Sequence, residues 1–222
     1  MLFDYPTKAR FGRKIPKSKL YENASANTKL KDKFVNQIEK IVWQYKLAPN
    51  TLNLDATNKV PEIQVFDIFL KTKEVDQTLL EVIDKAIPLP IIFQIHKGNK
   101  VKIKAAYKRP SESANNKWVI ESYFESEWLD KDVVKQPMPQ ALDLGKLYEQ
   151  LLKSLMPVDV ISSKTTQTID QQVDKINNIN SLQKELDKLN SKYKKEKQRN
   201  RQFEINKEIK LKQKELNHLT KA

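Results

Sequence analysis

The sequence contains no cysteine, and this absence excludes several kinds of site at once. Disulfides, zinc–thiolate sites, iron–sulfur clusters and thiolate nucleophiles all need cysteine side chains. Glycine is also scarce, because Gly12, Gly98 and Gly145 are the only three and none belongs to a glycine-rich loop. The phosphate-binding loops of P-loop and dinucleotide-binding proteins are therefore not predicted. We expect no cofactor and no metal site.

Long apolar runs are also missing from the 222 residues. No stretch approaches the roughly 20 apolar residues of a transmembrane helix, and residues 1–19 lack the apolar run of a signal peptide. We therefore expect a soluble cytoplasmic protein that does not associate with a membrane. The length suits one domain of about 150 residues with an extension.

The formal net charge is +13, and it is concentrated at the two ends of the chain. Residues 1–60 hold 12 Lys or Arg against 5 Asp or Glu, and residues 164–222 hold 15 against 8, whereas the middle is close to neutral. A positive field attracts polyanions without identifying which polyanion is bound. The high Lys and Asn content also makes compositional bias an alternative explanation.

Three regions follow from composition and periodicity: a basic irregular arm at 1–24, an α+β domain at 25–157 and a charged helical extension at 158–222. In the domain, apolar residues recurring every three or four positions predict a helix over 25–47 that Ser25 or Asn27 caps. The stretch 61–128 predicts a β-α-β-β-β order and a mixed four-stranded sheet with packed helices. The strands are expected at 62–71, 91–97, 101–108 and 118–124, with a crossover helix at 76–87 and a further helix at 142–156.

The extension has neither Gly nor Pro from about Thr166 onward, and its sparse apolar residues are spaced like a coiled-coil seam. Two such seams, at 182–193 and 205–219, are out of phase and separated by a polar stretch. One long helix and a helical hairpin both fit this pattern. We favour the hairpin, because folding back lets each apolar stripe bury the other.

Catalytic motifs are weak in this sequence. His96 and His218 are isolated, and a lone histidine on a strand is usually a packed or surface side chain. The enzymatic alternative is a metal-dependent nuclease centred on Asp67 with Glu62, Lys71 or Glu121. Asp67 and Lys71 are four strand residues apart, about 13 Å at roughly 3.3 Å per residue, which is too far to serve one metal-bound water. We expect no catalytic residues.

The densest charged feature is the stretch 192–201, KYKKEKQRNR, in which Glu196 is the one acid. Its basic residues form our candidate nucleic-acid-binding set: Lys192, Lys194, Lys195, Lys197, Arg199 and Arg201. A charged turn that serves only solubility is the competing interpretation. On a helix these charges would form a ring, which argues against an amphipathic membrane helix.

Several stretches together resemble one bacterial family, domain of unknown function 4391. The stretches are IPKSKLYENA (15–24), FVNQIEKIVWQYKLAPNTLNL (34–54), EIQVFDIFLKTKE (62–74), IDKAIPLPIIFQI (83–95) and KEKQRNRQFEINKEIK (195–210). The resemblance covers most of the chain and carries no catalytic motif. It implies an accessory subunit of an antiviral, restriction-modification-associated defence system, beside a helicase or DNA methyltransferase partner.

The sequence thus predicts a binding module that docks a helicase or methyltransferase and contacts nucleic acid through its basic ends. A metal-dependent nuclease and a purely structural protein–protein adaptor are the alternatives.

Overall fold

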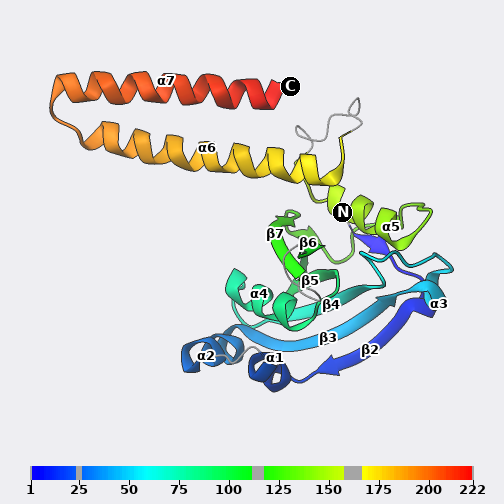
Figure 1. Ribbon diagram of the computed structural model, residues 1–222. Coiled ribbons are helices and arrows are strands. Elements are labelled where there is room, and N and C mark those ends of the chain that lie inside the picture. Colours follow the sequence, from blue (N-terminus) through cyan, green and yellow to red (C-terminus); the bar gives the residue numbers. More distant parts are fainter. Residues whose placement is uncertain (1, 24–26, 112–117, 158–166, 222) are drawn as a thin grey trace. The chain divides into compact units, whose positions relative to one another are not determined.

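The apolar run at 62–71 forms β4 (Ile63–Leu70), which lies inside the main sheet of the computed structural model (Figure 1). The strand order is β2 (Arg10–Ile15), β3 (Ile38–Leu47), β4, β5 (Ile91–Lys97), β6 (Lys100–Pro110) and β7 (Trp118–Glu125), and β8 (Leu129–Asp130) pairs with β6. β4 and β5 are parallel and are connected by α4 (Gln77–Ala86), whereas the other neighbours are antiparallel. The expected α+β class and mixed sheet are therefore confirmed.

The structure describes residues 2–23, 27–111, 118–157 and 167–221. The chain consists of two compact units, Met1–Met156 and Pro157–Ala222. The first unit holds both sheets and the helices that pack on them. The second holds α6 (Ile169–Lys195) and α7 (Arg199–Lys221). Among the described helices, none combines the length and apolar character needed to cross a membrane.

The N-terminal segment is ordered, so the prediction of an irregular arm over 1–24 is wrong for the part that the structure describes. It forms β1 (Phe3–Asp4), a short 3-10 helix η1 (Thr7–Ala9), β2 and α1 (Lys17–Asn23). β1 pairs with β9 (Gln136–Pro137) in a separate two-stranded parallel sheet. Gly12 has a φ of 66°, and it lies where the β2–β3 register shifts, so glycine allows the bulge. These short elements have no period long enough to detect.

The single helix expected over 25–47 is also wrong. The first part of this range is α2 (Thr28–Gln37), and the second part is β3. The Asn27 side chain caps α2 by accepting a hydrogen bond from Leu30 N. Ser25 lies outside the described residues. β3 has register shifts at two places along its pairing with β4. Each bulge changes which residues face the core, so buried Ile38 and Ile41 fall three residues apart and imitate helical spacing.

The main sheet has seven strands where four were expected. The four expected strands correspond to β4, β5, β6 and β7. The additional strands are β2 and β3, from the region assigned to the arm and the first helix, and β8. The turn between β5 and β6 falls at Gly98, whose φ is 54°, as the Gly-Asn pair predicts.

One face of the main sheet packs against α1, α2 and α4 (Figure 1). Leu20, Phe34 and Leu79 come from these three helices, and Phe66 and Phe93 come from the central strands beneath them. Asp76 caps α4 through a hydrogen bond from Thr78 N to its carboxylate. The predicted helix at 142–156 is α5 (Leu144–Lys153), capped by Asp143 in the same way.

Candidate functional site

The helices α6 and α7 form an antiparallel pair that turns at Glu196–Gln198. Leu182, Leu186 and Leu216 are buried together, and Ile179, Ile209 and Leu219 pack around them. Lys212 of α7 also forms an ion pair with Glu185 of α6. The two apolar stripes therefore bury each other within one chain, as the hairpin interpretation requires.

The turn is held by hydrogen bonds that involve its single acid. Glu196 Oε1 accepts from the backbone N–H groups of Gln198 and Lys197, both at 2.9 Å, and Gln202 Nε2 donates to Glu196 O at 2.7 Å. The backbone hydrogen bond from Gln198 is the largest influence that holds the pKa of Glu196 below its ordinary value. Glu196, the C-cap residue of α6, therefore stabilises the turn between the two helices.

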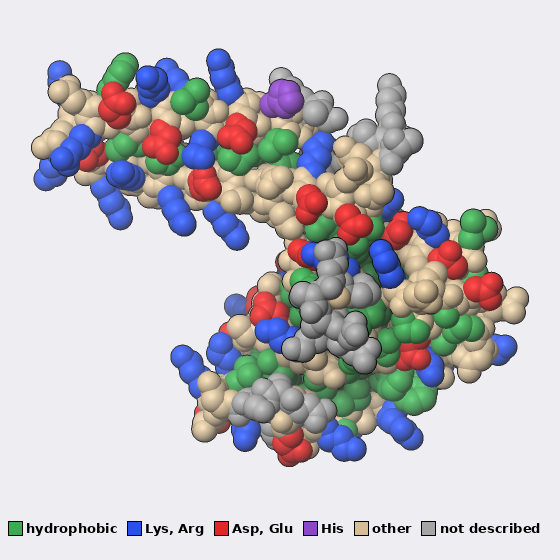
Figure 2. Space-filling view, viewed as in Figure 1, with side chains coloured by type: hydrophobic (Ala, Val, Ile, Leu, Met, Phe, Trp, Pro, Cys, Tyr) green, Lys and Arg blue, Asp and Glu red, His purple; other side chains and the backbone are tan. Residues whose placement is uncertain are grey.

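The six candidate basic residues all lie at this turn and are all exposed. We call this set (Lys192, Lys194, Lys195, Lys197, Arg199 and Arg201) the basic tip. None of the six forms an ion pair with an acidic residue in the part of the chain that the structure describes. Lysine and arginine side chains project around this end of the hairpin (Figure 2). The basic tip therefore presents six cations that no ion pair within the described residues offsets.

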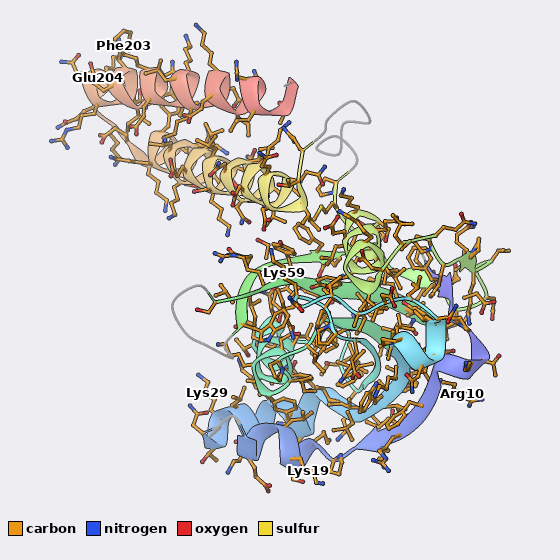
Figure 3. All side chains as sticks on the ribbon, turned by 45° about the vertical axis from the view of Figure 1, so that its right-hand side comes forward. Arg10, Lys19, Lys29, Lys59, Phe203 and Glu204 are labelled. Atoms are coloured by element: carbon orange, nitrogen blue, oxygen red, sulfur yellow. The ribbon has the colours of Figure 1, made fainter. Side chains whose placement is uncertain are left out.

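The surroundings of the basic tip are mixed in character. A shallow groove of about 680 Å³ beside the turn is lined by Lys192, Arg201 and Lys207 but also by Glu204 and Glu208. A channel of uniform positive charge is therefore not formed there. Phe203, at the beginning of α7, is 69% exposed and lies two residues after Arg201 and directly before Glu204 (Figure 3).

The N-terminal basic residues have a structural explanation. Arg10, Arg13 and Lys14 are exposed on β2, which is the edge strand of the main sheet. Charged side chains on an edge strand oppose edge-to-edge pairing with another chain. Lys17 Nζ donates to Ile38 O at 2.8 Å and so serves the fold.

The residues of the nuclease alternative do not form one site. Glu62 forms an ion pair with Lys46 at 3.1 Å. Glu121 lies on β7 and forms an ion pair with Arg109 at 2.8 Å, and two strands, β5 and β6, separate β7 from the strand that carries Asp67. Lys71 Nζ donates to Val35 O at 2.7 Å. No group of three or more metal-binding side chains occurs in residues 2–23, 27–111, 118–157 and 167–221. The arrangement gives a metal-dependent nuclease no support.

Asp67 instead contacts His96, an arrangement that the sequence reasoning missed. Asp67 lies on β4 and His96 on β5, and Asp67 Oδ1 is 3.0 Å from His96 Nε2. Both side chains are largely buried, and the His96 ring stacks on Phe69 with centroids 4.7 Å apart. They line a cavity of about 180 Å³ together with Tyr5 and Gln94. The cavity is a second candidate site.

A buried ionic cluster near α4 is a structural feature. The Lys108 ammonium pairs with Asp84 at 2.6 Å and donates to the carbonyl oxygens of Asp84, Ile87 and Leu89. Burial raises the pKa of Asp84 and lowers that of Lys108, and their contact opposes both changes. Because three of the ammonium contacts are carbonyls at the end of α4, Lys108 satisfies the helix terminus.

The fold and the basic tip define an α+β protein with a basic helical hairpin. The chain matches the family described as domain of unknown function (DUF4391) over residues 3–216, so it belongs to that family. The same comparisons find no match among curated proteins or among solved structures. The family assignment predicted from the quoted stretches is therefore confirmed.

Proposed function

We propose that the protein is a non-catalytic binding module that contacts the phosphate backbone of nucleic acid through its basic tip. The observation that carries the proposal is the group of six exposed cations at one turn, with no ion pair to a described acid. Exposed Lys and Arg contribute affinity by releasing counterions condensed on the phosphates. The hairpin presents these cations on packed helices, which lowers the conformational freedom lost on binding.

The turn supports this interpretation over one of solubility alone. Surface lysines that serve solubility are usually interspersed with acids, whereas the basic tip has six cations and one acid within ten residues. That acid, Glu196, is bound by two backbone N–H groups. The stretch 192–201 therefore keeps a strongly positive net charge, with six cations against one acid.

The test measures binding of a fluorescent oligonucleotide to the full chain over a series of salt concentrations. With all six residues of the basic tip changed to Gln, affinity at low salt should fall by at least ten-fold. The slope of log K against log [salt] should also become shallower, by roughly 0.7–0.9 for each phosphate contact that is lost. Equal binding by this variant and the unmodified protein would refute the proposal.

A matched comparison separates the basic tip from general basicity. Lys195→Gln/Lys197→Gln/Arg201→Gln removes three charges from the tip, and Lys19→Gln/Lys29→Gln/Lys59→Gln removes three from the first unit. The latter three are exposed side chains, labelled in Figure 3. The tip variant should lose the larger share of affinity. Equal losses would mean that net charge alone, and not the tip, drives binding.

The family resemblance adds a proposed setting. In this proposal the protein is an accessory subunit of an antiviral defence system, and the first unit docks a helicase or DNA methyltransferase. A pull-down from cells followed by nuclease treatment tests the protein contact. A partner that persists after nuclease treatment supports direct docking, and one that is lost was bridged by nucleic acid. If partners persist and oligonucleotide affinity is negligible, the protein is an adaptor only.

A further inference from the structure

The cavity beside Asp67 and His96 concentrates polar side chains on the sheet face opposite α1, α2 and α4. Along β4 and β5, Phe66 and Phe93 face those helices, so their sequence neighbours Asp67 and Gln94 face the other way. Asp67 is paired in register with Gln94, and Phe69 with His96. Leu2, Phe3 and Tyr5 of the N-terminal segment close over these residues. The cavity therefore depends on the ordered N-terminus.

The lining is more polar than packing requires. Tyr5 is buried and lines the cavity together with Gln94, and burial raises the pKa of the Tyr5 hydroxyl. Gln44 and Tyr45 of β3 add another amide and another phenol. His96 Nδ1 is buried and has no hydrogen-bond partner among the residues that the structure describes. Buried polar groups normally have partners, so an imidazole nitrogen without one favours a site that a ligand or water completes.

The volume limits what could enter. The cavity measures about 180 Å³. Sites that enclose a whole drug-sized ligand are larger, roughly 300–1,000 Å³. The cavity therefore suits one planar ring system, with the remainder of the ligand outside it.

The chemistry of the lining matches the edge and the face of a nucleobase. Carboxylate and amide side chains recognise bases through the hydrogen bonds of their edges, and aromatic rings stack on their faces. Asp67 and Gln94 supply the first kind of group. Tyr5 and Tyr45 supply aromatic surface in the cavity lining; their ring centroids are 4.9 Å apart, so the two rings pack against each other and a base can contact only the sides of this pair. A carboxylate has about four acceptor positions, so the bond from His96 leaves capacity for further donors.

Two lysines complete the arrangement. Lys131 and Lys135 also line the cavity, and both are exposed. We propose that the cavity binds a guanine nucleotide, with the base held by Asp67 and Gln94 and the phosphate by Lys131 and Lys135. Guanine is chosen because N1–H and the N2 amino group are neighbouring donors on one edge and fit a carboxylate acceptor. This site goes beyond the proposed function and is independent of the basic tip.

The experiment is calorimetric titration of the full chain with guanosine 5′-monophosphate, uridine 5′-monophosphate, guanosine and inorganic phosphate. The guanine nucleotide should bind at least ten-fold more tightly than the uridine nucleotide. It should also bind more tightly than guanosine or phosphate alone. Equal affinity for the two nucleotides, or binding that phosphate alone reproduces, would overturn the assignment.

Two variants locate the binding. Asp67→Asn should lower the affinity for the guanine nucleotide at least ten-fold, because the amide N–H₂ opposes the donors of guanine. Lys131→Gln/Lys135→Gln changes only exposed side chains, so it keeps the test decisive if Asp67→Asn does not fold. It should remove the preference for the nucleotide over guanosine. Unchanged affinities in the folded variants would refute the site.

The proposal can fail separately from the proposed function. The variant with six Gln residues in the basic tip should bind the guanine nucleotide as the unmodified protein does. If that variant loses nucleotide binding, the ligand is held at the tip and the cavity assignment is wrong.

Discussion

Replacing Lys108 by Met should destabilise the first unit more than any surface charge change. The Lys108 and Asp84 side chains are both 0% exposed, and their charged groups are 2.6 Å apart. The Met side chain keeps the apolar stem but removes the ammonium, so Asp84 loses its ion-pair partner. The carbonyl oxygens of Ile87 and Leu89 lose a donor at 3.1 and 2.7 Å.

Removing one partner of a buried ion pair costs about 3–5 kcal/mol, a large part of the roughly 5–15 kcal/mol that stabilises a domain. Asp84 can lower this cost by taking up a proton, since burial already raises its pKa. We therefore expect a loss of about 3 kcal/mol. At roughly 2 kcal/mol per molar urea, the unfolding midpoint should fall by about 1.5 M.

Urea unfolding followed by tryptophan fluorescence measures this change selectively, because Trp43, Trp118 and Trp128 all belong to the first unit. The control is Lys100→Met, which breaks a pair with Asp130 whose side chains are 52% and 60% exposed. It should cost less than about 1 kcal/mol. If Lys108→Met costs no more than this control, the burial argument is wrong. Adding Asp84→Asn should recover part of the loss, since no unpaired carboxylate then remains.

Three further predictions concern the helices. Asp76→Ala should cost about 1–2 kcal/mol at pH 7 through loss of the α4 cap. The hydrogen bond from Lys33 lowers the folded-state pKa of Asp76 from 3.8 to about 2, so the stabilisation by the Asp76 carboxylate is present above pH 4 and is lost as the pH falls from 4 to 2. The urea midpoints of the variant and the unmodified protein should therefore converge in that pH range. Leu186→Ser should reduce the helical circular dichroism without moving the tryptophan transition; loss of both together would contradict independent folding of the two units. Phe203→Ala should weaken binding to a single-stranded oligonucleotide by at least five-fold, since stacking on a base is worth about 1–3 kcal/mol. The control is Leu211→Ala, which also removes an exposed apolar side chain of α7 and should not weaken binding. Equal effects of the two substitutions would exclude stacking.

Elements with one strong periodic signal were predictable from the sequence. β4 is predicted by its apolar run, and α4 by its cap and its amphipathic pattern. The two apolar stripes of α6 and α7 predict a helical extension, and they favoured the hairpin without excluding one long helix. β3 was not predictable, because its bulges shift the alternation and give Ile38 and Ile41 a helical spacing. β1 and β9 have two residues each and owe their order to pairing with one another.

The two candidate sites differ in the same way. The basic tip is contiguous in sequence, so its residues could be found by counting charges. The Asp67–His96 contact joins two parallel strands across the α4 crossover, and a crossover leaves the strand register undetermined until the sheet is packed. The sequence places Asp67 on a strand, but no sequence signal connects it to a histidine 29 residues away.

Salt concentration should distinguish the two sites by their physical basis. Binding at the basic tip depends on releasing counterions from a polyanion, so its log K should fall with log [salt] at a slope of about −4.2 to −5.4 if all six cations contact phosphates. A mononucleotide has no comparable condensed counterion layer, and the cavity offers Lys131 and Lys135 as its exposed cations. Its binding should therefore depend on salt only weakly, with hydrogen bonds from Asp67 and Gln94 supplying the selectivity. Titrations at roughly 50 and 200 mM salt should compare the salt dependence of log K for an oligonucleotide and for guanosine 5′-monophosphate. Equally steep slopes would mean that surface lysines, and not the cavity, hold the mononucleotide.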